Sequence, residues 1–160
     1  MDTATAQRGF PWKGVLIGCG VVCSVGFGLL CGGMVWVLSG HEGRVRLSNE
    51  MEDYAALYLE EHQILNSSES LIAYYDVTLT LDGTEAAIIT TENVIYHNGG
   101  TSTSIPLSDI TNIRHRNETM MGDIIEIDSR SGIPMKIEIA PLNRGETFLN
   151  VLRDAWERSK

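Results

Sequence analysis

The sequence predicts an α+β protein in two parts: one membrane-spanning helix near the amino end, then a domain of about seven antiparallel strands and a carboxyl-terminal helix. Three observations predict this arrangement. Residues 14–38 are apolar and contain no charged side chain. Residues 71–140 alternate short segments rich in β-favouring residues with turn residues. Residues 143–158 carry apolar side chains at helical spacing on one face.

The apolar run is long enough to cross a bilayer as a helix. At 1.5 Å per residue its 25 residues reach about 37 Å, whereas the hydrocarbon core is about 30 Å thick. Trp12 and Trp36 lie near its two ends, where indole rings favour the membrane interface. We therefore expect four parts, which are a tail at 1–13, a transmembrane helix at 14–39, a juxtamembrane linker and helix at 40–66, and a domain at 67–160.

Three alternatives to an uncleaved anchor fit the run less well. A signal peptide has an apolar region of 7–15 residues and a small-residue cleavage site, but this run is longer and Val37-Leu38-Ser39-Gly40 is a weak site. A lipoprotein signal at Leu16-Ile17-Gly18-Cys19 would have almost no apolar residues ahead of it. Buried core helices are usually shorter than this run. The anchor is therefore favoured.

In the expected membrane helix, four small residues from Gly20 to Gly32 recur every four positions, which places them in one stripe, and Gly14 and Gly18 form a second pair with the same spacing. Together these small residues are Gly14, Gly18, Gly20, Ser24, Gly28 and Gly32. Small residues allow two helix backbones to approach closely in lipid, so the stripe favours packing against a second copy or another membrane protein. The alternative is that glycine is simply common in membrane helices. The expected partners are therefore the bilayer and, through the stripe, a membrane protein or the chain itself.

The charge is strongly acidic. The chain has 12 Lys and Arg against 21 Asp and Glu, and from residue 41 onward the numbers are 10 and 20. This balance disfavours binding to nucleic acid and a broad basic surface for anionic headgroups.

All three cysteines lie in the apolar run, so the rest of the chain has no internal disulfide, which fits a reducing compartment. Flanking charges leave the orientation open, because two basic residues lie on each side of the run.

The domain is expected to contain elements in a definite order. We expect a helix at 48–63 and strands at 71–81, 85–90, 94–97, 101–106, 110–115, 123–128 and 135–140. Asp82-Gly83 favours a two-residue hairpin turn between the first two strands. The last helix is expected to begin at Asn143, with Glu146 completing a capping box.

Two segments and the last helix resemble the bacterial pleckstrin-homology-like domains, including their GRAM-type branch. The segments are Ala87–Tyr96 and Ser104–Ile113, and the helix contributes Phe148, Leu152 and Trp156. The resemblance implies a bent barrel of about seven strands capped by the terminal helix, a binding or scaffolding role without catalysis, and a cytoplasmic domain. Asn93 stands where the family often has a basic residue, and the charged residues from Asp76 to Glu92 are all acidic. Lipid-headgroup binding is therefore not expected.

The sequence contains no recognisable catalytic, cofactor or metal motif, and no small-molecule substrate is expected. Arg114 and Arg116 should share a strand face, where they either pair with the many acids or contact an acidic partner or a lipid phosphate. Met120 and Met121 follow in a loop, as an exposed apolar tip or as core residues.

These observations favour a single-pass protein of the cytoplasmic membrane that acts by protein–protein association. An alternative is an accessory subunit of a larger membrane enzyme, channel or transporter. An enzyme would instead need a deep polar pocket with converging ionisable groups.

If the small-residue stripe is a packing face, substituting Gly28→Leu together with Gly32→Leu will weaken association. The two larger side chains would hold the helix backbones apart and remove close contacts. A membrane dimerisation assay measures the effect, and an unchanged signal would rule out association through this stripe.

Overall fold

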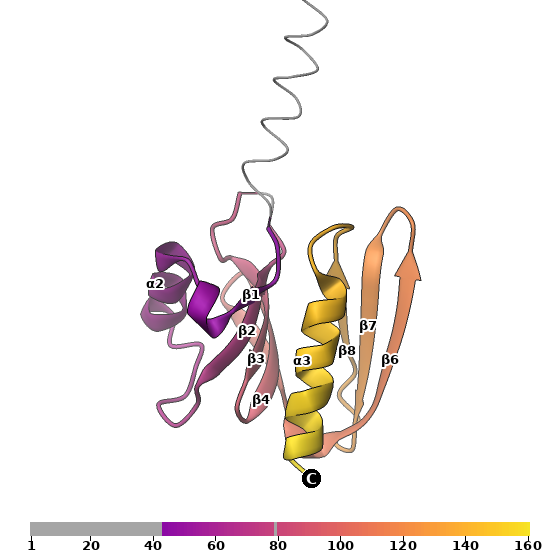
Figure 1. The fold of residues 1–160 in the computed structure, drawn as a ribbon. Coiled ribbons are helices and arrows are strands. Elements are labelled where there is room, and N and C mark those ends of the chain that lie inside the picture. The colour runs from indigo at the N-terminus through magenta and orange to yellow at the C-terminus, as the bar shows by residue number, and fades with distance from the viewer. Residues whose placement is uncertain (1–42, 79) are drawn as a thin grey trace, which may run out of the picture. The chain divides into compact units, whose positions relative to one another are not determined.

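The computed structural model describes residues 43–78 and 80–160 (Figure 1). In chain order the elements are β1 (Arg46–Leu47), the 3-10 turn η1 (Ser48–Glu50), α2 (Asp53–Glu61), β2 (Leu71–Asp76), β3 (Glu85–Thr90), β4 (Asn93–Asn98), β5 (Thr101–Pro106), the 3-10 turn η2 (Leu107–Asp109), β6 (Ile110–Glu118), β7 (Gly122–Ser129), β8 (Met135–Ile139) and α3 (Gly145–Arg158).

The expected tail, transmembrane helix and small-residue stripe lie outside the described residues. Within residues 43–78 and 80–160, no helix combines the length and the apolar character needed to span a membrane.

The strands form two antiparallel sheets. One sheet has five strands in the order β1-β2-β3-β4-β5, and the other has three in the order β6-β7-β8. The expectation of about seven strands in one bent barrel is thus only partly met, because the ladder does not continue from β5 to β6. The physical reason lies between these strands, where Pro106 has no N–H for the ladder and η2 redirects the chain. The short strand β1 was not expected.

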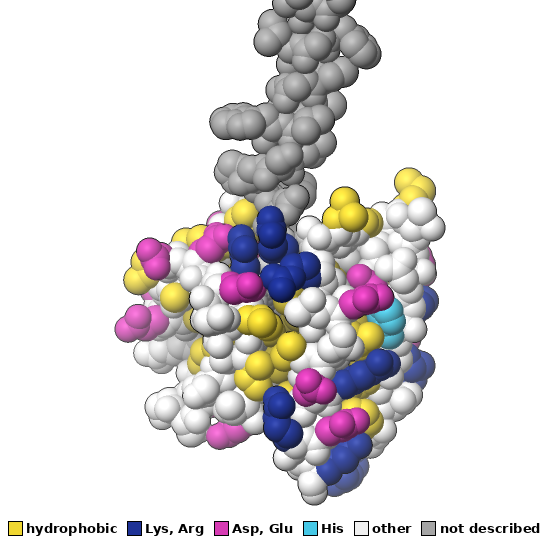
Figure 2. Space-filling model, viewed as in Figure 1, with side chains coloured by type: hydrophobic (Ala, Val, Ile, Leu, Met, Phe, Trp, Pro, Cys, Tyr) yellow, Lys and Arg dark blue, Asp and Glu magenta, His cyan; other side chains and the backbone are white. Residues whose placement is uncertain are grey.

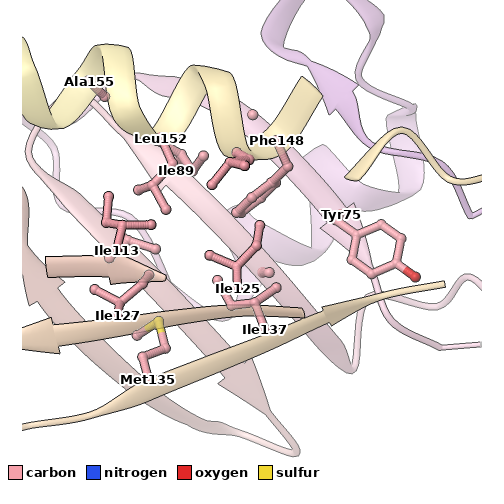
Figure 3. Close-up of a cluster of buried hydrophobic side chains, with 14 of the residues drawn as sticks. Tyr75, Ile89, Ile113, Ile125, Ile127, Met135, Ile137, Phe148, Leu152 and Ala155 are labelled. Carbon is pink, nitrogen blue, oxygen red and sulfur yellow. The ribbon is translucent and has the colours of Figure 1, made fainter. Parts of the chain in front are cut away.

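The main core lies between the two sheets and α3. Figure 3 shows Ile89 of the first sheet and Ile125 and Ile137 of the second directed toward Phe148 and Leu152 of α3. These five side chains are fully buried. Such burial stabilises the fold by about 1.5–3 kcal/mol for each large side chain. The indole N–H of Trp156 also donates to the carbonyl of Ile110 at 3.0 Å, which fixes the last turns of α3 against β6.

A second core lies on the opposite face of the five-stranded sheet. Ala55 and Leu59 of α2 pack there against the sheet residues Tyr74, Ile88 and Ile95. Strand β3 is therefore buried on both faces, and five of its six residues are buried consecutively. In contrast, β8 alternates buried and more exposed residues, as expected for a strand covered on one face.

Two local expectations were wrong. The helix expected at 48–63 is divided into η1 and α2 by an extended stretch at Met51 and Glu52. The tight Asp82-Gly83 hairpin is instead a longer loop, because β2 ends at Asp76 and β3 begins at Glu85. The buried Asp76 carboxylate organises this loop by accepting the N–H groups of Thr78 and Gly83, both at 2.9 Å. The sequence pattern did not indicate that Asp76, the last residue of β2, would be buried and would bind the loop that follows it.

Helix α3 begins differently from the expected capping box. Its N-cap residue is Arg144 in the left-handed conformation, with φ of 65°, and no side chain caps the helix. Gly145 lies against the buried Asp123 of β7, and a Cβ at this glycine would lie 2.2 Å from the carboxylate. Asp123 also accepts hydrogen bonds from His115 at 2.8 Å and Asn117 at 2.9 Å. The close approach of helix to strand therefore sets where α3 starts.

The connection before α3 is tied to the start of the described chain. The N–H of Val45 donates to the carbonyl of Asn143 at 3.0 Å. The Arg144 guanidinium forms an ion pair with Glu50 at 3.0 Å, while Arg46 pairs with Glu52 at 2.5 Å. Segments about 100 residues apart in the chain therefore lie side by side at this end of the domain.

Candidate functional site

The two arginines singled out from the sequence do share a face of β6, where carboxylates engage both. Arg114 pairs with Glu126 at 3.2 Å and also with Asp128. Arg116 pairs with Glu126 at 2.6 Å and with Glu118 at 2.9 Å. Hydrogen bonds from Arg116 and then Arg114 lower the pKa of the Glu126 carboxyl. A phosphate or acidic partner would have to compete with these carboxylates, so contact through the arginines remains a prediction.

The two methionines lie at the exposed turn between β6 and β7. Met120 is 91% exposed and Met121 is 47% exposed. Both side chains therefore lie at the surface and not in the core, while their contact with a partner or a membrane remains a prediction. The turn projects at one end of the domain (Figure 1).

A larger apolar feature lies beside α2, where the structure forms a groove of about 610 Å³. The helix, the preceding turn and the loop before β2 together form its walls. The lining is mainly apolar, and its residues are Ser48, Met51, Ala56, Leu59, Glu60, Gln63, Leu65, Ser70 and Leu71. We call this feature the α2 groove. Its walls come from residues up to 23 positions apart, so the periodicity of the sequence did not predict it.

Leu65 explains how the groove forms. Helix α2 ends at Glu61, four residues before Leu65. Gln63 then adopts the left-handed conformation, with φ of 50°, and turns the chain away from the helix axis. Leu65 therefore lies beyond the helix, and it lines the groove together with Met51. The sequence signal that could have indicated the groove is the presence of apolar residues directly after a strongly acidic helix.

Two histidines that are distant in the sequence meet next to α2. The hydroxyl of Tyr58 lies 3.2 Å from Nε2 of His97, and Nδ1 of His97 lies 2.9 Å from Oγ of Ser102. The His62 and His97 rings are 6.4 Å apart. Burial, followed by the charge of His62, lowers the pKa of His97. The cluster joins α2 to β4 and β5, and across residues 43–78 and 80–160 no metal-holding group of His, Cys, Asp or Glu is found.

Asn93, which departs from the resembled family, has a structural role. Its side-chain amide donates to the buried carboxylate of Glu69 at 2.7 Å, and Asn66 donates to the same oxygen at 2.5 Å. An amide at position 93 therefore fixes the loop that forms one wall of the α2 groove.

Comparison with known proteins supports the fold alone. No family model matches the chain, and no curated protein matches it. A solved structure of a DUF1696 family protein with a pleckstrin-homology domain from Shewanella loihica PV-4 is similar, with a TM-score of 0.51. The match has 16% sequence identity and covers 71% of this chain and 98% of that one. The described domain therefore has a pleckstrin-homology-like fold.

The buried imidazole of His97 should make stability depend on pH. Its pKa is lowered in the folded state, so the unfolded chain binds a proton more readily. The His97 contribution is therefore lost as the pH falls below about 6.5, the ordinary histidine pKa. We expect His97→Gln to reduce the drop in urea midpoint between pH 7.5 and 5.5, measured on the full chain in detergent. An unchanged drop would contradict this role.

Proposed function

We propose that this chain is a non-catalytic binding module, held at a membrane by residues 14–39, that docks an apolar segment of another membrane protein in the α2 groove. The observation that carries the proposal is the groove itself, an open and mainly apolar surface on a folded scaffold. Glu60 is the one ionisable residue of its lining. Such a lining suits apolar contact better than acid–base chemistry, which needs converging ionisable groups.

The charge around the groove indicates the chemistry of the partner. Residues 48–63 contain five acids and no Lys or Arg. Asp53, Glu60 and Glu61 are exposed on α2. A partner segment with apolar side chains flanked by Lys or Arg would therefore fill the groove and complement its rim. We expect an amphipathic helix or an extended strand, because both place apolar side chains along one face.

Substitutions in the groove test this proposal. Met51→Lys together with Leu65→Lys would place two charges where apolar contact is expected, and binding should fall by about 2 kcal/mol or more, roughly thirtyfold. The matched control is Leu57→Lys, because Leu57 is 64% exposed on the same helix and lies outside the groove lining. Affinity purification of the full chain from membranes in mild detergent, followed by quantitative mass spectrometry, measures partner recovery. Equal recovery with both variants would refute docking in the groove.

The same purification separates the two assembly modes. A stoichiometric unrelated protein would favour the accessory-subunit alternative, in which the helix at 14–39 packs on a larger membrane complex. Recovery of the chain alone as an oligomer would favour self-association through the small-residue stripe.

We further propose that the domain faces the cytoplasm, on the basis of the resemblance and the absence of cysteine outside residues 19–31. Ser131→Cys provides a reporter, since Ser131 is exposed in the turn between β7 and β8. A membrane-impermeant maleimide should label this cysteine in broken cells but not in intact ones. Labelling in intact cells would place the domain on the other side.

A further inference from the structure

Two exposed apolar tips project from different loops at one end of the domain. Leu142, between β8 and α3, is 96% exposed, and Met120, between β6 and β7, is 91% exposed. Figure 2 shows hydrophobic side chains at both of these loops, beside a group of Lys and Arg side chains. Single exposed apolar side chains are common on protein surfaces, whereas several gathered in one place mark a candidate contact surface.

The two loops lie next to each other. A Cβ at Gly122, which follows Met121, would lie 2.1 Å from the carbonyl oxygen of Ile139 and close to Pro141. The turn that carries Met120 and Met121 therefore contacts the segment that leads directly into Leu142. We call the surface formed by residues 119–122 and 140–144 the tip surface.

The start of the described chain lies at the same end. Val45 is hydrogen-bonded to Asn143, the residue after Leu142. Gly43 is four residues after position 39, the end of the expected membrane helix, and four extended residues span at most about 14 Å. An anchor at 14–39 would therefore hold this end of the domain, and not the opposite one, close to the bilayer.

We propose that the tip surface contacts the lipid bilayer, with Met120, Met121 and Leu142 inserted among the headgroups. The inference rests on the membrane anchor in the proposed function. A bilayer is favoured over a second protein because the apolar residues protrude singly from two loops. A protein interface would more often present a continuous packed surface. The tether also makes the bilayer the nearest apolar phase.

The contact should be apolar rather than electrostatic. The basic residues at this end include Arg46 and Arg144, and both have carboxylate partners. The domain as a whole is acidic. Anionic lipid is therefore not expected to strengthen the contact, which distinguishes it from recognition of an acidic headgroup.

Spin labels on the full chain in phosphatidylcholine vesicles test this inference. In a background with Cys19, Cys23 and Cys31 replaced by alanine, single variants Met120→Cys and Leu142→Cys carry the label. Ile133→Cys is the matched control, because Ile133 is apolar and exposed in the turn between β7 and β8, at the opposite end of the strands. A fourth chain that retains only Cys23 reports on the anchor. Collision rates with lipid-soluble oxygen and with an aqueous nickel chelate are compared.

We expect the ratio of oxygen to nickel collisions to be severalfold higher at positions 120 and 142 than at 133, and unchanged by added phosphatidylserine. Nickel accessibility at 120 and 142 equal to that at 133, with the Cys23 label in lipid, would overturn the tip contact and leave the anchor intact. Shielding of 120 and 142 from both reagents would show a protein interface and would also overturn it. A water-accessible Cys23 label would refute the anchor and this inference together.

Discussion

The structure depends on covering both faces of the sheet formed by β2, β3 and β4. One face meets the second sheet and α3, and the other meets α2. Because β3 is buried on both sides, a polar substitution at Ile88 or Ile89 would leave an unsatisfied group in one core or the other. Helix α2 is thus part of the domain's core rather than an appendage, so the groove beside it is lined by a helix that is packed against the sheet.

The placement of α2 links the fold to the candidate function. Its inward face supplies Ala55 and Leu59 to the core. Ala56, the residue after Ala55, is exposed in the groove. A helix held in this way can present an apolar surface without changing its own position when a partner binds. Pre-organisation of this kind lowers the entropy lost on association.

Much of the fold could be predicted from local patterns, and the failures have physical causes. Seven strand segments and the terminal helix were recognisable because period-two and helical spacing reflect burial on one face. The loop at 77–84 was missed because its conformation depends on Asp76, a carboxylate whose burial requires the tertiary fold. The start of α3 was misplaced because contact between Gly145 and Asp123, 22 residues apart, overrides the local capping signal.

The candidate site was less predictable than the fold. The sequence indicated that Arg114 and Arg116 form a basic pair on one strand face. Glu126 lies on the neighbouring strand β7 and forms ion pairs with both. The pairing of strands, which a linear pattern does not specify, decided this outcome. Met120 and Met121 could be recognised as a loop feature, but their proximity to Leu142 depends on how β6, β7 and β8 pair.

The bond between Val45 and Asn143 has a mechanical consequence for a tethered domain. If residues 14–39 hold the chain in a membrane, as proposed, drag on the domain would act on the chain at Gly43. Strand β1 pairs with β2, and the ion pairs of Arg46 and Arg144 lie within a few residues. Tension applied at Gly43 is therefore shared between the edge of the first sheet and the segment that leads into α3. Several interactions must then break together before the amino-terminal segment separates from the domain.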